Sequence, residues 1–175
     1  MAMGVNPVIL QIVGYQNSGK TTLMCQLIEE ATRHNLRVGT MKHHGHGGKP
    51  DSASLNKDSD KHYAAGAVAS AVEGAGVLQL TAQLNQDDPE GLLAVLQAMP
   101  LDLILIEGYK HWPYPKVVLL KNQQDEKLLE QVNHTIAVVS LDERPQMTTY
   151  PVFLRGDEEQ LLLWLVSYIR RQQHA

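Results

Sequence analysis

The apolar positions near the N-terminus change their spacing once. A continuous run of mostly apolar residues, Val8–Val13, is typical of a buried strand. After a short polar stretch the apolar positions recur at helical spacing, at Met24, Leu27, Ile28 and Ala31. The pattern therefore predicts a strand, a loop and an amphipathic helix in direct succession.

Strands and helices are expected to alternate along the rest of the chain. The segment 101–108 is apolar without alternation, as in a parallel strand that is covered on both faces. Segments 67–74 and 76–83 alternate like two strands around a tight turn. Further strands are expected at 36–44, 115–122, 134–140 and 150–156, and helices at 58–67, at 87–99 and after Asp157, where Gln160 completes a capping box.

The loop after the first strand carries the pattern Gly-x-x-x-x-Gly-Lys-Thr, from Gly14 to Thr21. Its glycines let backbone N–H groups close around a phosphate, and the N-terminus of the following helix favours the same anion. Lys20 is expected to reach the β and γ phosphates, and the Thr21 hydroxyl to bind Mg²⁺. Together with the alternating elements, this P-loop predicts an α/β fold of P-loop NTPase type: a mostly parallel sheet flanked by helices, with a small additional β lobe.

The composition of the chain limits the number of domains, the kinds of binding partner and the cellular location that we expect. With 43% hydrophobic and 19% charged residues, the 175 residues suit a single nucleotide-binding domain over 1–175. The net charge of −4, without a long basic run, gives no indication of nucleic acid or an anionic membrane. The only cysteine, Cys25, excludes an internal disulfide and, with no leader pattern, predicts a cytoplasmic location. Cys25 is expected to be buried on the first helix.

Glu107 ends a buried strand, and this position suggests a functional role. The carboxyl ends of parallel strands form the edge at which the P-loop lies and at which ligands bind. Glu107 is therefore expected to hold Mg²⁺ through water or to orient an attacking water. Gly108 would let the backbone pass close to a nucleotide, and Lys110 could meet a phosphate. Asp102 begins the same strand, so a structural role at the opposite edge is expected for it.

Three histidines, His43, His44 and His46, follow Lys42 at the end of the second strand. Imidazole is a common zinc ligand, but no cysteine accompanies them, and the first two point to opposite faces of an extended chain. A polar role facing a phosphate is favoured over a structural metal. Lys42 lies where a second substrate would approach the nucleotide.

Two further sets of polar residues have more than one interpretation. Asp58 and Ser59 open a predicted helix, either as an N-cap or as ligands of a metal or water. The Asn/Thr-Lys-x-Asp signature of guanine recognition is absent at the expected place. Ser140 or Asp142, after a late strand, could lie near a base. The residue types alone do not choose between ATP and GTP.

The chain resembles the MobB family, GTP-binding adaptor proteins of molybdopterin-guanine dinucleotide biosynthesis. Four segments carry the resemblance in this order and spacing: GYQNSGKTTL, GTMKHHGH, KDSDKHYAAGA and LDLILIEGYKH, from Gly14 to His111. The P-loop alone is unspecific, whereas the Lys-His-x-x-His, Lys-Asp-Ser and Glu-Gly-Tyr-Lys segments together are specific. One departure is that the acid expected just after the histidines is displaced to Asp51.

The resemblance implies a homodimer, GTP and Mg²⁺ as ligands, and a guanylyltransferase of MobA type as partner. Whether molybdopterin also contacts this chain stays open at this point. The implied role is to assist attachment of GMP to molybdopterin, with at most slow GTPase activity. The implied catalytic residues are Glu107 and Lys20, and the implied metal ligands are Thr21, Asp58 and Glu107. The implied cofactor-binding residues are Gly14, Tyr15, Gln16, Asn17, Ser18, Gly19, Lys20, Thr21, Thr22, Lys42, His43, His46, Gly108 and Lys110.

Other protein classes share this fold and remain as alternatives. One is an autonomous P-loop enzyme, such as an ATP-dependent ligase of the dethiobiotin synthetase type or a small-molecule kinase. A kinase needs arginines at the transferred phosphate, and neither Arg33 nor Arg37 is placed for that. A metallochaperone GTPase would normally add cysteine ligands and the guanine signature, which are absent. The ligase stays open.

The last predicted helix has a wide apolar arc, formed by Leu161, Trp164, Leu165 and Tyr168 with Leu162, Val166 and Ile169 beside them. This arc is wider than one packing face requires, so part of it is expected to meet a second subunit. The alternative is a C-terminal helix wedged between the sheet and a loop of its own chain.

Overall fold

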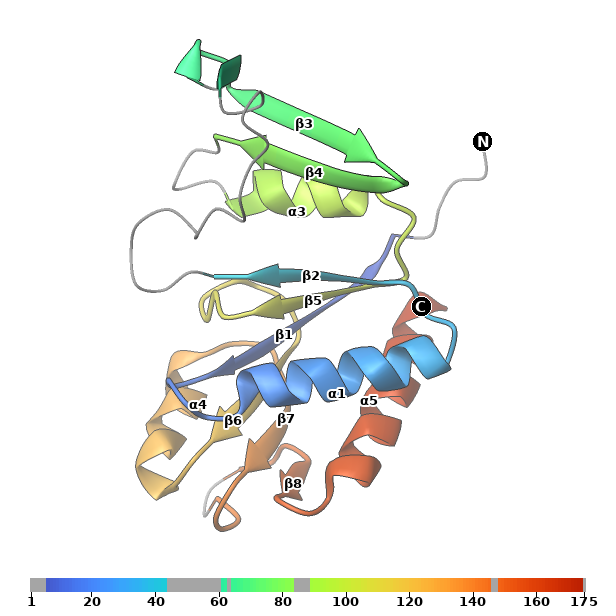
Figure 1. Ribbon diagram of the computed structural model, residues 1–175. Coiled ribbons are helices and arrows are strands. Elements are labelled where there is room, and N and C mark those ends of the chain that lie inside the picture. Colours follow the sequence, from blue (N-terminus) through green and yellow to red (C-terminus); the bar gives the residue numbers. More distant parts are fainter. Residues whose placement is uncertain (1–5, 44–60, 63, 84–88, 146–147, 175) are drawn as a thin grey trace. The chain divides into compact units, whose positions relative to one another are not determined.

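The computed structural model describes residues 6–43, 61–62, 64–83, 89–145 and 148–174 (Figure 1). The chain divides into two compact units. One consists of Met1–His43 with Leu96–Ala175, and the other of His44–Val95. The prediction that the whole chain acts as one domain stays a prediction.

The first unit is built on a six-stranded sheet in the order β2-β5-β1-β6-β7-β8. Every pairing in it is parallel, so the carboxyl ends of all six strands lie at the same edge. This confirms the predicted α/β fold with a P-loop after the first strand. The strands are β1 (Val8–Gly14), β2 (Val38–Lys42), β5 (Leu103–Glu107), β6 (Lys116–Leu120), β7 (Thr135–Ser140) and β8 (Val152–Leu154).

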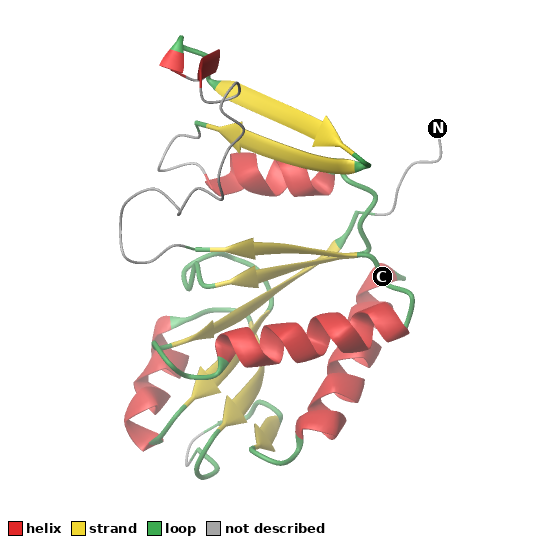
Figure 2. Cartoon of the chain, viewed as in Figure 1, coloured by secondary structure: helices red, strands yellow, loops and turns green. Residues whose placement is uncertain are grey.

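Helices cover both faces of this sheet (Figure 2). Helices α1 (Lys20–Arg33) and α5 (Glu158–Gln173) share one core with Leu10 and Ile12 of β1. A 3₁₀ turn, η1 (Gln123–Glu126), leads into α4 (Lys127–Gln131), which packs with Val13 on the opposite face. The alternating contacts of β1 explain why its sequence is apolar without a polar face. The elements η1 and α4 were not predicted.

The wide apolar arc of α5 is used inside the chain. Leu161, Leu165, Val166 and Ile169 are buried, and Leu162, Trp164 and Tyr168 pack against the same core. Of the large apolar side chains on α5, only Leu163 is exposed. The helix therefore packs within its own chain, as in the alternative, but against the sheet and helix α1, where the alternative had the sheet and a loop. It gives no support for a second subunit.

Two smaller predictions were wrong. Asp157 is the N-cap of α5, but its Oδ2 atom accepts a hydrogen bond from the backbone N–H of Leu154 instead of capping the helix. Cys25 is exposed, because it lies to one side of the buried stripe formed by Met24, Leu27 and Ala31. None of the described helices is long and apolar enough to cross a membrane.

The second unit contains the predicted β lobe. Strands β3 (Ala69–Gly74) and β4 (Val77–Ala82) pair antiparallel around a turn at Ala75 and Gly76. Helix α3 (Pro89–Gln97) follows, as expected from its leucine pattern. Of the helix predicted at 58–67, residues 61, 62 and 64 are helical, and 58–60 and 63 lie outside the described residues.

Candidate functional site

The P-loop joins β1 to α1 at the carboxyl edge of the sheet. A Cβ atom on Gly14 would collide with the Ser18 hydroxyl and lie 2.9 Å from the carbonyl oxygen of Leu119. Gly19 has a φ of +86°, which favours glycine, and Lys20 begins the helix directly after it. Since Gly19 has no side chain to cap α1, the N–H groups of its first turn are left to bind an anion.

The side chains of the P-loop are open to a ligand or lack a partner. Gln16, Asn17, Thr21 and Thr22 are exposed, and Tyr15 is half-buried. Ser18 is fully buried, and its hydroxyl has no hydrogen-bond partner within the described part of the chain. An unpaired buried hydroxyl costs free energy, so a ligand that supplies a partner would stabilise the loop.

Lys20 points back over the loop that precedes it. Its Nζ atom donates a hydrogen bond to the carbonyl oxygen of Tyr15 at 2.7 Å. Burial lowers the pKa of Lys20; the charge of Glu107 opposes this effect, and the charges of Lys110, Lys42 and Lys121 add to it. Lys20 is thus an ammonium group that lacks sufficient negative charge around it, as expected for a phosphate-binding lysine.

Glu107 lies between a hydroxyl group and an ammonium group. The Thr21 hydroxyl is 3.3 and 3.4 Å from the two carboxylate oxygens, and Lys42 Nζ is 3.3 Å from Oε1. Lys42 and Glu107 are partners in the β2–β5 register, and only 8% of Glu107 is exposed. Mg²⁺ prefers oxygen ligands, so the hydroxyl of Thr21 and the carboxylate of Glu107 fit this ion.

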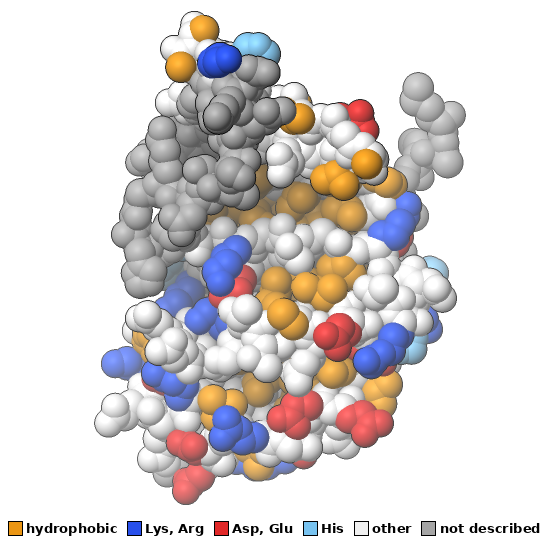
Figure 3. Space-filling model, viewed as in Figure 1, with side chains coloured by type: hydrophobic (Ala, Val, Ile, Leu, Met, Phe, Trp, Pro, Cys, Tyr) orange, Lys and Arg blue, Asp and Glu red, His pale blue; other side chains and the backbone are white. Residues whose placement is uncertain are grey.

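Four neighbouring strands each present one lysine at this edge. Lys42 ends β2, Lys110 follows β5, Lys20 follows β1 and Lys121 follows β6. Figure 3 shows Lys and Arg side chains gathered on the side toward which these strands point. Lys110 Nζ lies 4.2 Å from the centre of the Tyr15 ring, within the range of a cation–π contact. Lys121 was missed, although it directly follows the buried strand β6, just as Glu107 ends the buried strand β5.

Of the predicted site residues from His43 to Ser59, the structure describes only His43. His43 is exposed, and its backbone N–H extends the β2–β5 pairing by donating to the carbonyl oxygen of Glu107 at 3.0 Å. His44, His46, Asp51, Asp58 and Ser59 lie outside the described residues. Among the residues that are described, no group of three His, Cys, Asp or Glu side chains could hold a metal ion.

Asp102 lies at the opposite edge of the sheet, as predicted. Its carboxylate accepts hydrogen bonds from the backbone N–H and the guanidinium group of Arg37. Arg33 pairs with Glu30 at the last turn of α1. Of the two residues considered for a base, Ser140 donates to the carbonyl oxygen of Glu143, and Asp142 is exposed.

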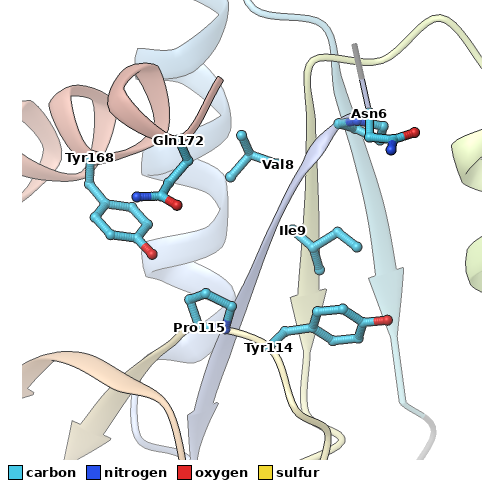
Figure 4. Close-up of a pocket in the computed structure, with 8 residues that line it drawn as sticks. Asn6, Val8, Ile9, Tyr114, Pro115, Tyr168 and Gln172 are labelled. Carbon is cyan, nitrogen blue, oxygen red and sulfur yellow. The ribbon is translucent and has the colours of Figure 1, made fainter. Parts of the chain in front are cut away.

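A hollow of about 270 Å³ lies at the amino end of β1, away from the P-loop (Figure 4). Val8 and Ile9 of β1 line it together with Tyr114 and with Tyr168 and Gln172 of α5. Because the P-loop follows the other end of β1, this hollow is separate from the P-loop edge of the sheet.

Comparisons with known proteins agree with this geometry. The family model described as "MobB: Molybdopterin guanine dinucleotide synthesis protein B" matches residues 9–141. A probable molybdopterin-guanine dinucleotide biosynthesis adapter protein of Bacillus subtilis is 45% identical over 152 residues, which cover 85% of this chain and 86% of that protein. The corresponding adapter protein of Escherichia coli is 29% identical over 169 residues, or 94% of each chain.

Solved structures show the same fold. The crystal structure of Bacillus subtilis MobB superposes with a TM-score of 0.77 at 40% identity, covering 91% of this chain and 96% of that one. A MobB homologue from Bacillus stearothermophilus gives a TM-score of 0.76 at 36% identity, covering 93% and 98%. The P-loop, the strand-end glutamate and these matches agree, and the chain belongs to the MobB family of molybdopterin guanine dinucleotide synthesis proteins.

Proposed function

We propose that this protein binds GTP with Mg²⁺ at its P-loop and acts as an adapter in the synthesis of molybdopterin guanine dinucleotide. The observation that carries the proposal is the meeting of Thr21 and Glu107 beside the P-loop lysine. The hydroxyl and the carboxylate suit Mg²⁺, and the ammonium group suits the phosphates of a nucleoside triphosphate.

Each residue has a separate part in this proposal. Lys20 leaves the Tyr15 carbonyl and contacts the β and γ phosphates, while N–H groups between Gly14 and Thr22 surround them. Thr21 and Glu107 would hold Mg²⁺, with Asp58 as a further ligand, and the ion would neutralise charge on the phosphates. Lys42, His43, Gly108 and Lys110 would lie beside the bound nucleotide, toward β2 and β5. His46, which lies outside the described residues, stays a proposed contact.

The relatives named adapter proteins support an accessory role, not an autonomous ligase. An adapter acts through a partner, and we propose a guanylyltransferase of MobA type, with molybdopterin as the second ligand. We also propose that the protein is a homodimer. The exposed apolar side chains of the β lobe, Val77, Leu78 and Leu80, support this better than α5 does. The cytoplasmic location stays a prediction.

Calorimetric titration with GTP and ATP, each with and without Mg²⁺, tests the proposed function. We expect GTP to bind more tightly than ATP and Mg²⁺ to strengthen binding, because the ion offsets the charge of the triphosphate. Lys20→Ala should weaken GTP binding at least tenfold while the circular dichroism spectrum stays unchanged. Equal GTP affinity in the Lys20→Ala variant and the natural protein would refute the assignment of the P-loop lysine.

A further inference from the structure

A row of aromatic rings begins at the nucleotide-binding edge. The ring centres of His43 and Tyr109 are 4.6 Å apart, and those of Tyr109 and Trp112 are 4.3 Å apart in a stacked arrangement. His43 follows β2 directly, and Tyr109 lies two residues after Glu107. His43 is exposed and the other two rings are half-buried, so the row is not a closed core.

Two buried polar side chains hold the loop that carries these rings. Gln11 Nε2 donates to the carbonyl oxygens of Gly108 at 3.0 Å and Tyr109 at 2.8 Å. Lys116 Nζ donates to the carbonyl oxygens of Trp112 and Tyr114 at 2.8 and 2.9 Å. Both donors are fully buried. A loop that only connected two strands would not require such costly groups beneath it.

The backbone of this loop is strained at its first aromatic residue. Tyr109 has a φ of +49°, in the left-handed region that residues other than glycine rarely adopt. Such strain persists only where the surroundings impose it, and it concentrates at ligand-binding sites. The hydrogen bond from Gln11 to the Tyr109 carbonyl is one of the contacts that impose it. The rings are thus held in place before any ligand arrives.

Positive charge accompanies the rings. Lys42 precedes His43 in the chain, and Lys110 lies between Tyr109 and Trp112. Around Lys20, three further lysines, Lys42, Lys110 and Lys121, add positive charge, and Glu107 supplies the negative charge that opposes it. Lys20 and Mg²⁺ already neutralise much of the charge of a bound triphosphate. Lys42, whose partner Glu107 would hold Mg²⁺, and Lys110, whose Nζ atom rests on the Tyr15 ring, could therefore meet a second anionic group.

We propose that Lys42, His43, Tyr109, Lys110 and Trp112 form a second ligand subsite for a planar heteroaromatic ring that carries a phosphate monoester. Such a ring stacks on the aromatic row, and its phosphate, with a charge of about −1.5 to −2 at pH 7, meets the two lysines. This inference rests on the proposed function, in which a phosphorylated pterin is the second ligand beside the nucleotide.

The hollow at the amino end of β1 does not offer the same chemistry. Tyr114, whose ring centre is 5.8 Å from that of Trp112, also lines this hollow. The residues described around the hollow include no lysine or arginine. A ring with a phosphate therefore fits the β2–β5 corner and not the hollow.

The two tryptophans of the chain allow a direct test. Trp112 lies in the proposed subsite, whereas Trp164 packs on α5 against Phe153 and Tyr168. Trp164→Phe leaves Trp112 as the only tryptophan, and Trp112→Phe leaves Trp164, with excitation at a wavelength that tyrosine hardly absorbs. Each variant is saturated with Mg²⁺ and a non-hydrolysable GTP analogue and then titrated with 6-hydroxymethylpterin phosphate. We expect saturable quenching, after inner-filter correction, in the variant that keeps Trp112 alone.

Matched ligands and lysine variants separate the ring from the phosphate. We expect 6-hydroxymethylpterin without phosphate to bind at least tenfold more weakly than the phosphorylated compound. We also expect the phosphorylated compound to bind Lys42→Ala or Lys110→Ala at least tenfold more weakly than it binds the protein with both lysines. The exposed Arg155, which follows β8 at the far side of the sheet, serves as the control, and Arg155→Ala should bind unchanged. Inorganic phosphate that binds as tightly as the pterin phosphate, or equal quenching of both tryptophans, would overturn the subsite.

GTP binding is measured by calorimetry on the same preparations, so the two proposals can fail separately. GTP binding without saturable quenching of Trp112 would contradict the second subsite and leave the proposed function intact. Absence of GTP binding would contradict the proposed function, whatever the pterin phosphate does.

Discussion

Gln11 and Lys116 are direct partners in the β1–β6 pairing, and both donate hydrogen bonds into the loop between β5 and β6. Both side chains are fully buried on the sheet face opposite α1 and α5. Lys116 also donates to the carbonyl oxygen of Asn133 at 2.7 Å, so one ammonium group joins two loops. The buried side chains of β1 and β6 thereby fix the conformation of the loop that follows Glu107.

Replacement of Lys116 by methionine keeps the length of the side chain and removes its three donors. Three backbone carbonyls then lose the hydrogen bond from Lys116, and a buried polar group that is left unpaired costs about 1–3 kcal/mol. We expect the free energy of unfolding in urea to fall by about 3 kcal/mol. Lys127→Met, at an exposed lysine, is the control and should change it by less than about 0.5 kcal/mol. Equal stability of both variants would contradict the role given to Lys116.

The carboxylate of Glu107 should matter for Mg²⁺ more than for the nucleotide itself. In Glu107→Gln the shape is kept and the charge is lost, so we expect Mg²⁺ to strengthen GTP binding much less than it does in the natural protein. Without Mg²⁺, the variant should bind GTP as tightly or more tightly, because repulsion between the carboxylate and the phosphates is gone. Both effects are read from calorimetric titrations.

Asp102→Asn is the matched control for Glu107→Gln. It removes a carboxylate next to the same strand, but at the opposite edge of the sheet, where Asp102 pairs with Arg37. Its effect on Mg²⁺-dependent GTP binding should be negligible. A similar loss in both variants would indicate a general loss of structure.

Most of the P-loop edge of the sheet could be predicted from the sequence, because its signals are local. The P-loop lies between a recognisable strand and helix, and Glu107 ends an apolar run. The same strand-end argument applied to Lys121 would have found a fourth lysine of the edge. Helix α4 was missed because its five residues give too short a pattern to distinguish it from a loop.

Contacts that depend on the order of strands could not be read from the chain. His43 and Tyr109 meet because β2 pairs with β5, which are far apart in the sequence. The arc of α5 looked too wide for one face, yet α5 packs on β1 and β8 and on α1 as well. Its width is therefore explained by two packing faces within the same chain.

The affinity for GTP should depend on pH through Lys20. Its pKa in the free protein is lowered by burial, and a bound triphosphate would raise it again. Between these two pKa values binding takes up a proton, so GTP affinity is expected to fall as the pH rises through the lowered pKa towards the ordinary lysine pKa of about 10.4. Titrations in buffers of different ionisation enthalpy measure this proton uptake.

In Lys20→Met, GTP binding should be weaker and the proton uptake should disappear. Persistence of the same proton uptake in this variant would show that another group titrates.

The β lobe should take part in dimer formation. Leu78 and Leu80 lie on the same face of β4 and are 55% and 47% exposed. We expect a dimer mass in light scattering at micromolar concentration, and a monomer mass for Leu80→Asp. Leu163→Asp, at the exposed position of α5, should stay dimeric. A monomeric natural protein, or dissociation caused only by Leu163→Asp, would contradict this interface.

GTP hydrolysis by the isolated protein should be slow, because the groups around Lys20 bind phosphate without a strong means of stabilising its transition state. The charges that act on Lys20 are those of Glu107 and three lysines, and no arginine is among them in the described residues. An arginine at this place contributes about 10³–10⁵ in rate in related chemistry. Arg33 and Arg37 are held elsewhere by Glu30 and Asp102.

A site that binds tightly and turns over slowly suits a protein that acts when its partner is present. We therefore expect steady-state turnover well below about 1 s⁻¹ for the protein alone, a value at the lower end for typical enzymes. Phosphate release is measured with and without the guanylyltransferase, and Lys20→Ala gives the background. Turnover above this value without a partner would favour an autonomous enzyme, because an adapter has no use for GTP consumed before its partner binds.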